Sequence, residues 1–348
     1  MLKIAQDAQV ASGHTCPIHH VAHDYFGMRL ATCSSDKTIR VFEKGEDDKW
    51  VLASQWNAHK GVIWKVGWAH PEFGQVLASC SDDRTVMIWS EIGGGTPDSK
   101  LTFQLMATLT DFEKGVRCIT FAPNHMGLIL ASGCNDGKVR LHHGSATKLQ
   151  EWTLQSDFSP DLDHPATAAG FSTAGLSIYV TGLSWNKNRG DCAMLAVGWW
   201  RGGEPGMTMS NVAVWGFHTE RKTWGLVTRL ELELDRRGSM AEVRDVDWAN
   251  SCGRTTHVIA AAVGSTVQVW KLPSLSGWPI RKLEPVVPLP LPEVREASAA
   301  SALTFWQVGW SVTGTSLAAS AEDGHVAVWK LDMAGHLQLH AALDPETK

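Results

Sequence analysis

ASCSDDRTVMIW, residues 78–89, decides the fold, because the same pattern returns three more times along the chain. In each copy, small residues lead to an Asp, two turn residues follow, and an alternating strand closes on a bulky ring six positions after the Asp. The other copies are ATCSSDKTIRVF (31–42), ASGCNDGKVRLH (131–142) and AASAEDGHVAVW (318–329). Four copies of one unit predict a repeat protein.

Two positions of this unit recur with a clear physical role. The carboxylate of an Asp accepts hydrogen bonds from nearby backbone N–H groups and so suits a tight turn. The closing ring buries a large apolar surface against the neighbouring unit. The turn positions are Asp36, Asp83, Asp136 and Asp323, and the closing positions are Phe42, Trp89, His142 and Trp329. Two weaker copies close at Trp215 and at Trp270, the latter with Gly264 in place of the Asp.

Each hairpin is flanked by two further strand-like runs. The run before it alternates and ends in a ring, as in WKVGW (64–68) and WQVGW (306–310). A short apolar run, such as VLASQW (51–56), follows the hairpin. In the preceding run the third residue shares a face with the closing ring, because strand side chains alternate; these residues are Val66, Ile119, Val246 and Val308. Each unit is therefore predicted to be four antiparallel strands, which is a propeller blade.

We expect an all-β WD-repeat β-propeller of six four-stranded blades, in a single domain that spans residues 1–348. Too few residues remain at either end for a seventh blade. Six blades can close a ring, but blades whose geometry suits seven would leave a gap with two uncovered sheet faces. The sequence leaves both outcomes open. The expected blades lie near residues 18–56, 62–109, 116–154, 178–232, 243–290 and 303–343.

Composition excludes several classes of function. Hydrophobic residues make up 44% of the chain, charged residues 19%, and the formal net charge is -5, so no global positive field attracts nucleic acid. No run of about 18 apolar residues and no secretory signal is visible, so we expect no membrane insertion. The seven Cys residues include no C-x-x-C pair, and we interpret them as reduced thiols in the core.

The sequence predicts no enzyme, no metal site and no cofactor. His19, His20 and His23 lack zinc spacing with Cys partners, and neighbouring strand residues point to opposite faces. The acidic pairs 82–83 and 322–323 belong to the repeated turn, which favours a structural role over paired catalytic carboxylates. Neither a phosphate loop nor a G-x-S-x-G nucleophile elbow is present.

Several longer segments resemble the SEC-thirteen-homologue nucleoporins. The resemblance is strong in the first three blades and in the last, and it fades across residues 155–300. Its segments are HDYFGMRLATCSSD (23–36), WAHPEFGQVLASCSDDRTVMIW (68–89), APNHMGLILASGCNDGKVR (122–140) and WQVGWSVTGTSLAASAEDGHVAVWK (306–330). The COPII vesicle-coat propeller shares part of this pattern, but PEFGQVLASC, NHMGLIL and TGTSLAAS favour the nucleoporins.

The resemblance implies a scaffold of the Y-shaped nuclear pore subcomplex. It implies an open ring that an α-helical solenoid scaffold nucleoporin completes by supplying a blade in trans, together with other Y-complex members. Its expected place is the nuclear pore complex of the nuclear envelope, where it supports transport of protein and mRNA. A second role, in a coat-like nutrient-sensing complex in the cytoplasm or at the lysosomal or vacuolar surface, is also implied. The alternatives are a COPII coat propeller and, in another class, a ligand-binding or enzymatic propeller.

An open ring would expose faces of the first and last blades, because those blades border the gap. The expected contacts with the partner blade are Ile39, Val41, Trp306, Val308, Val326 and Val328.

Overall fold

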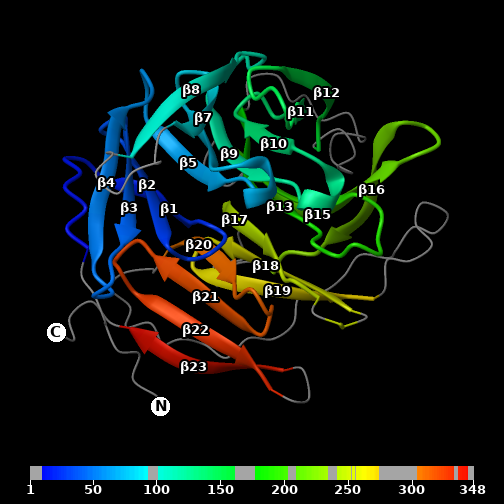
Figure 1. Cartoon of the computed structure of the whole chain (residues 1–348). Helices are drawn as coiled ribbons and strands as arrows, with labels where there is room; N and C mark the ends of the chain where they lie inside the picture. The colour runs from blue at the N-terminus through cyan, green and yellow to red at the C-terminus, as the bar shows by residue number, and fades with distance from the viewer. Residues whose placement is uncertain are drawn as a thin grey trace. The chain divides into compact units, whose positions relative to one another are not determined.

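The fold is all-β, as expected. The computed structural model describes residues 10–92, 101–160, 177–202, 209–233, 241–251, 253–254, 256–273, 304–332 and 336–343. The chain divides into two compact units, formed by residues 6–158 and by residues 159–348, and each carries three antiparallel sheets (Figure 1). The six sheets are the six predicted β-propeller blades. The assignment of residues 1–348 to a single domain stays a prediction.

The unit of residues 6–158 contains the first three blades, each with four strands paired in chain order. The first blade comprises β1 (Ile18–His23), β2 (Arg29–Ser34), β3 (Thr38–Lys44) and β4 (Trp50–Asn57). The second comprises β5 (Ile63–Trp68), β6 (Val76–Ser81), β7 (Val86–Ile92) and β8 (Thr102–Leu109). The third comprises β9 (Val116–Phe121), β10 (Ile129–Cys134), β11 (Val139–Gly144) and β12 (Trp152–Phe158). Short 3₁₀ helices, η1 (Pro71–Phe73) and η2 (Asn124–Met126), join the first two strands of the second and third blades.

The unit of residues 159–348 contains the other three blades. The fourth blade comprises β13 (Ser177–Trp185), β14 (Met194–Gly202), β15 (Met209–His218) and β16 (Thr223–Leu230). The fifth comprises β17 (Val243–Trp248), β18 (His257–Val263) and β19 (Thr266–Leu272). The sixth comprises β20 (Phe305–Trp310), β21 (Ser316–Ala321), β22 (Val326–Leu331) and β23 (Leu337–Leu343). The fourth strand that we expected in the fifth blade lies outside the described residues.

In the described part of the chain, core layers lie between consecutive blades of one unit. We call the face of a blade that packs on the preceding blade its leading face, and the opposite face its trailing face. Between the first two blades, Ile39 and Val41 of the trailing face pack against Val66 and Trp89 of the next leading face. Val246 and Trp270 share a second such layer, and Val308 and Trp329 share a third. These pairs confirm that the third residue of the run before each hairpin, such as Val66 in WKVGW, lies on the same face of the blade as the closing ring.

The buried cysteines behave as core residues. Cys33, Cys80, Cys118 and Cys134 are buried, Cys16 and Cys192 are exposed, and none of these six forms a disulfide. Burial raises the pKa of the Cys134 thiol to about 11, so this thiol stays protonated at neutral pH. Within the described part of the chain, no helix is long and apolar enough to cross a membrane.

Candidate partner-binding surface

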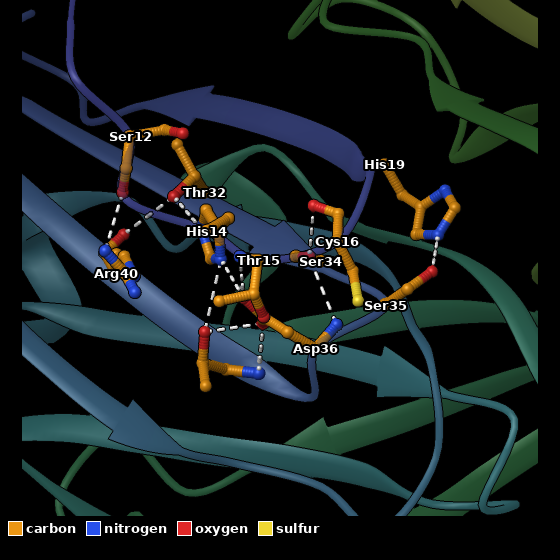
Figure 2. Close-up of polar contacts among 11 residues, drawn as sticks. Ser12, His14, Thr15, Cys16, His19, Thr32, Ser34, Ser35, Asp36 and Arg40 are labelled. Atoms are coloured by element: carbon orange, nitrogen blue, oxygen red, sulfur yellow. Dashed lines mark hydrogen bonds and ion pairs between the residues drawn. The ribbon is translucent and has the colours of Figure 1, made fainter.

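A histidine upstream of the first blade holds the β2–β3 turn in place. The Nδ1 of His14 lies 2.8 Å from Asp36 Oδ2, and its Nε2 lies 2.8 Å from Thr32 Oγ1 on β2 (Figure 2). The carboxylate of Asp36 also accepts hydrogen bonds from the Thr38 hydroxyl at 2.6 Å and from the Thr15 backbone N–H at 3.2 Å. The segment before β1 is therefore fixed to the turn at the far end of the hairpin.

The second blade repeats this network and extends it to the closing ring. The indole N–H of Trp89 donates to Ser79 Oγ at 3.0 Å, and Ser79 Oγ lies 2.7 Å from His59 Nε2. The Nδ1 of His59 lies 3.0 Å from Asp83 Oδ2, and Thr85 donates its hydroxyl hydrogen to Asp83 Oδ1 at 2.6 Å. Because a carboxylate only accepts, Nδ1 of His59 carries the proton and donates it. These hydrogen bonds connect β6, β7, the β6–β7 turn and the segment before β5 to the carboxylate of Asp83.

The third and fifth blades stabilise the turn and the closing ring with other groups. In the third blade Arg140 Nη2 lies 2.7 Å from Asp136 Oδ2, and both side chains are buried. In the fifth blade Gly264 leaves no carboxylate, and the Trp270 indole N–H donates instead to the backbone carbonyl of Glu231 at 2.9 Å. The group that contacts the turn or the closing ring therefore changes from blade to blade.

Acid is expected to weaken the first blade through Asp36. Burial alone would raise the pKa of this carboxyl, but hydrogen bonds from Thr38 and His14 outweigh burial and hold the pKa well below its usual value. A depressed carboxyl pKa gives stability that is present above the unfolded value, about pH 4, and is lost as pH falls further. Urea unfolding should show Asp36→Asn less stable than the wild type at pH 7, with the difference shrinking at pH 3. A difference that is unchanged between these pH values would contradict this assignment.

The leading face of the first blade carries two exposed apolar side chains. Val21 pairs with Thr32 as Val66 pairs with Ser79, so Val21 occupies the leading-face position of the first blade. Ile18 and Val21 are 39% and 42% exposed, whereas the equivalent side chains of the second, third, fifth and sixth blades are at most 5% exposed. Those eight residues are Ile63, Val66, Val116, Ile119, Val243, Val246, Phe305 and Val308.

The trailing face of the sixth blade is exposed in the same way. Each blade has an Ala on its second strand opposite the residue that precedes the closing ring, as in the pairing of Ala318 with Val328. In the other five blades this Ala is 0% exposed, whereas Ala318 is exposed and Val326 and Val328 are half-buried. The buried equivalents are Ala31, Ala78, Ala131, Ala196 and Ala260. We call Ile18 and Val21, with Ala318, Val326 and Val328, the terminal faces.

The six predicted contact residues divide into three groups. Val326 and Val328 lie on the terminal face of the sixth blade. Ile39, Val41 and Val308 are buried against a neighbouring blade of their own unit.

Trp306 forms the third group. It is 40% exposed on β20, the first strand of the sixth blade, and the guanidinium carbon of Arg244 lies 4.2 Å from the centroid of its ring. The alternation identified which residues share a face but not which of the two faces is covered, and so it missed Ile18 and Val21. That the predicted residues contact a partner blade stays a prediction.

Among the described residues, no group of three or more His, Cys, Asp or Glu side chains is placed to hold a metal ion. His14 and His59 each contact a turn carboxylate through Nδ1 and a hydroxyl of the second strand of the blade through Nε2.

Comparisons with known proteins agree with this description. The model of the WD domain, G-beta repeat, matches residues 7–43, 50–90 and 103–143. The chain is 33% identical to nucleoporin SEH1 of Danio rerio, over 92% of this chain and 82% of the relative. It is 34% identical to nucleoporin SEH1-A of Xenopus laevis and to nucleoporin SEH1 of Homo sapiens, over 92% of this chain and 83% of each relative. The chain belongs to the SEH1 nucleoporin family.

Membership of the SEH1 family settles the broad class of function. The family is a structural family and not an enzyme family, and a nucleoporin implies the nuclear pore complex. The resemblance found in the sequence is thereby confirmed. The three matched segments cover the hairpins of the first three blades, in which the turn Asp contacts a His or an Arg.

Proposed function

We propose that this SEH1-family protein is a scaffold nucleoporin whose terminal faces receive a blade supplied by a partner. The observation that carries the proposal is the exposure of Ile18 and Val21 at one end of the blade series and of Ala318 at the other. The residues equivalent to Ile18 and Val21 in the second, third, fifth and sixth blades, and those equivalent to Ala318 in the first five blades, are buried. An apolar sheet face in water is unfavourable, so natural proteins cover it.

The chemistry of the terminal faces fits a sheet. On the sixth blade Ala318 lies between Gly309 and Val328 of the adjacent strands, and Ser320 pairs with Val326. Small residues on a flat face allow close approach of a second sheet, as they do between the first two blades. The insert should therefore present β-branched and aromatic side chains on alternating positions, as every blade of this chain does.

The partner is an α-helical solenoid scaffold nucleoporin that supplies this insert in trans, within the Y-shaped subcomplex and alongside its other members. In that place the protein supports the architecture through which protein and mRNA move between nucleus and cytoplasm. The same surface would serve a second, coat-like nutrient-sensing complex in the cytoplasm or at the lysosomal or vacuolar surface. No catalytic group is needed for either role.

A charge on a terminal face is expected to abolish partner binding without unfolding the protein. Val21→Glu and Val328→Glu each place a carboxylate where the insert would bury it unpaired, which should weaken binding at least about a hundredfold. The measurement is co-purification with the co-expressed solenoid nucleoporin. Val51→Glu is the matched control, because Val51 is 60% exposed on the outer strand β4.

Circular dichroism melts show whether each variant is folded, and Ile18→Ser supplies a milder change if Val21→Glu is not. Tagged wild-type protein should label the nuclear rim, and the terminal-face variants should lose that label. Wild-type binding by folded Val21→Glu and Val328→Glu would refute the proposed surface, and labelling of endoplasmic-reticulum exit sites would favour the COPII alternative.

A further inference from the structure

The turn between β1 and β2 displays two aromatic rings to solvent. Tyr25 and Phe26 are 66% and 63% exposed, and Met28, which follows them in the turn, is 51% exposed. Gly, Pro, Asn, Asp and Ser are the usual residues of tight turns. Large apolar side chains that lie exposed together mark interaction sites. We call Tyr25, Phe26 and Met28 the aromatic turn.

Hydrogen bonds fix the backbone of the aromatic turn. Oδ1 of the buried Asp24 accepts hydrogen bonds from the backbone N–H groups of Met28 at 2.8 Å and of Arg29 at 3.0 Å. The Gly27 N–H donates to the Asp24 carbonyl at 3.2 Å, and Gly27 has a φ of 69°, which glycine adopts without a steric penalty. The rings are therefore presented by a preformed turn, which lowers the conformational entropy lost when a partner binds.

The sixth blade forms the same turn without aromatic rings. The Gly314 N–H donates to the Ser311 carbonyl at 2.7 Å, and Gly314 has a φ of 64°. The Ser311 hydroxyl oxygen accepts hydrogen bonds from the two backbone N–H groups at the end of the turn, as the carboxylate does in the first blade. Val312 and Thr313 stand where the first blade has its two rings. Folding of this turn therefore does not require aromatic side chains.

The ring of Tyr25 lies against the second blade, next to a carboxylate. It contacts the Phe26 ring edge-on at a centroid distance of 5.2 Å and the His70 ring at 4.8 Å. His70 is the N-cap of η1, and its Nδ1 accepts a hydrogen bond from the Glu72 backbone N–H at 3.2 Å. The Glu72 side chain is 59% exposed, and its Oε2 lies 3.9 Å from His70 Nδ1. An exposed carboxylate therefore borders the aromatic turn.

Carboxylates outnumber cations at the end of the first two blades that carries the aromatic turn. Each cation among the described residues there is in an ion pair with one of these carboxylates, and Arg29 is in two. Glu46 and Glu72 pair with neither Lys nor Arg in this part of the chain, so the surplus charge is negative. The carboxylates are Asp24, Glu43, Glu46, Asp47, Asp48, Glu72 and Glu91, and the cations are Arg29, Lys44 and Lys49.

We propose that the aromatic turn binds an arginine-containing segment of a partner protein, with a guanidinium stacked on Tyr25 and Phe26 and paired with Glu72. A guanidinium is planar, stacks on aromatic rings and donates to carboxylates, so it matches both chemical features of this surface. Oε2 of Glu72 accepts a hydrogen bond from Asn124 Nδ2 at 2.8 Å, and its Oε1 can accept one from the partner. The surplus negative charge attracts a basic segment and repels nucleic acid and anionic lipid.

This inference is independent of the inserted blade. Ile18 and Val21 lie on the leading face of the first blade, opposite the trailing face that packs on the second blade. Tyr25 instead contacts His70 of the second blade, at the loop end of the sheet. Loss of one interaction should therefore leave the other intact.

The test uses the purified full chain and a fluorescein-labelled 12-residue peptide of four Arg and eight Ser, read by fluorescence anisotropy. Tyr25→Ser with Phe26→Ser should weaken binding about tenfold, because two exposed cation–π contacts are lost. Glu72→Gln should weaken it about threefold and reduce its dependence on salt. The matched control is Val312→Ser, which removes an exposed apolar side chain from the same turn position of the sixth blade and should bind as the wild type does.

Two further probes separate an arginine-containing segment from other ligands. A peptide with Gln in place of every Arg should bind at least about tenfold more weakly. Sedimented vesicles of phosphatidylcholine and phosphatidylserine should not retain the protein, because the surplus charge repels an anionic surface. Circular dichroism melts show whether each variant is folded. If the double variant is not, Phe26→Ser alone keeps the contact of Tyr25 with His70 and should weaken peptide binding about threefold.

Four results would overturn the inference. The first is equal binding of the Gln and Arg peptides, and the second is equal affinity of the folded aromatic-turn variant and Val312→Ser. The third is retention of the wild type, but not of the aromatic-turn variant, by the vesicles. The fourth is loss of the co-expressed solenoid nucleoporin from the aromatic-turn variant, because the turn would then belong to the surface that receives the inserted blade.

Discussion

Replacing Asp83 with Ala is expected to destabilise the second blade by about 3 kcal/mol. The carboxylate accepts hydrogen bonds from His59, from the Lys60 backbone and from Thr85, and its side chain is 10% exposed. Removal leaves the His59 N–H buried without an acceptor, and an unsatisfied buried donor costs more than the lost hydrogen bond itself. Urea unfolding at pH 7 would measure the loss, and hydrogen exchange would locate it in β5–β8.

Asp323→Ala is the matched control, because Asp323 occupies the same turn position in the sixth blade. Its side chain is 42% exposed and accepts hydrogen bonds from His325 alone among the described residues, so its loss should cost less than about 1 kcal/mol. Equal losses in the two variants would show that the histidine network adds nothing beyond the turn.

Trp270→Ala is expected to cost about 4 kcal/mol, the larger of the two effects. Trp270 is 0% exposed and packs in the layer between the fourth and fifth blades, where Val214 and Val246 also lie. Its indole N–H is the donor that replaces the missing turn carboxylate, through the Glu231 carbonyl. The variant therefore loses both the apolar packing and the link to the preceding blade. The loss would appear as a lower urea midpoint at pH 7.

Trp270→Phe separates these two contributions. Phe keeps most of the apolar surface but has no N–H, so it should cost about 1–2 kcal/mol, from the hydrogen bond and the smaller volume. A Trp270→Phe protein as unstable as Trp270→Ala would mean that the hydrogen bond, and not the packing, carries the stability. A Trp270→Ala protein as stable as the wild type would contradict the core position altogether.

The hairpins and their core faces were predictable from the sequence because both are local. A period of two fixes which residues share a face, and Val66 with Trp89 and Val308 with Trp329 lie together as that period requires. Which of the two faces packs against another sheet depends on the neighbouring blades and not on the alternation within the strand. Ile39 and Val308 were therefore expected at the gap, although each is buried against a blade of its own unit.

The histidine networks were missed for a related reason. His14 and His59 precede their Asp partners by 22 and 24 residues and lie outside the repeated hairpin. A signal was present, because each His stands shortly before the first strand of its blade and at a similar distance from the turn Asp of that blade. The Glu231 carbonyl that binds Trp270 had no such signal, since every residue has a carbonyl and only the folded chain brings this one near.

The position of His59 has a practical consequence for dividing the chain. The residue that holds the second blade's turn comes before β5, in the connection from β4. An expression fragment cut at Ile63, where the blade's own strands begin, would leave His59 on the discarded piece. The natural boundary of this blade for truncation or circular permutation therefore lies upstream of residue 58, inside what the strand order alone assigns to its predecessor.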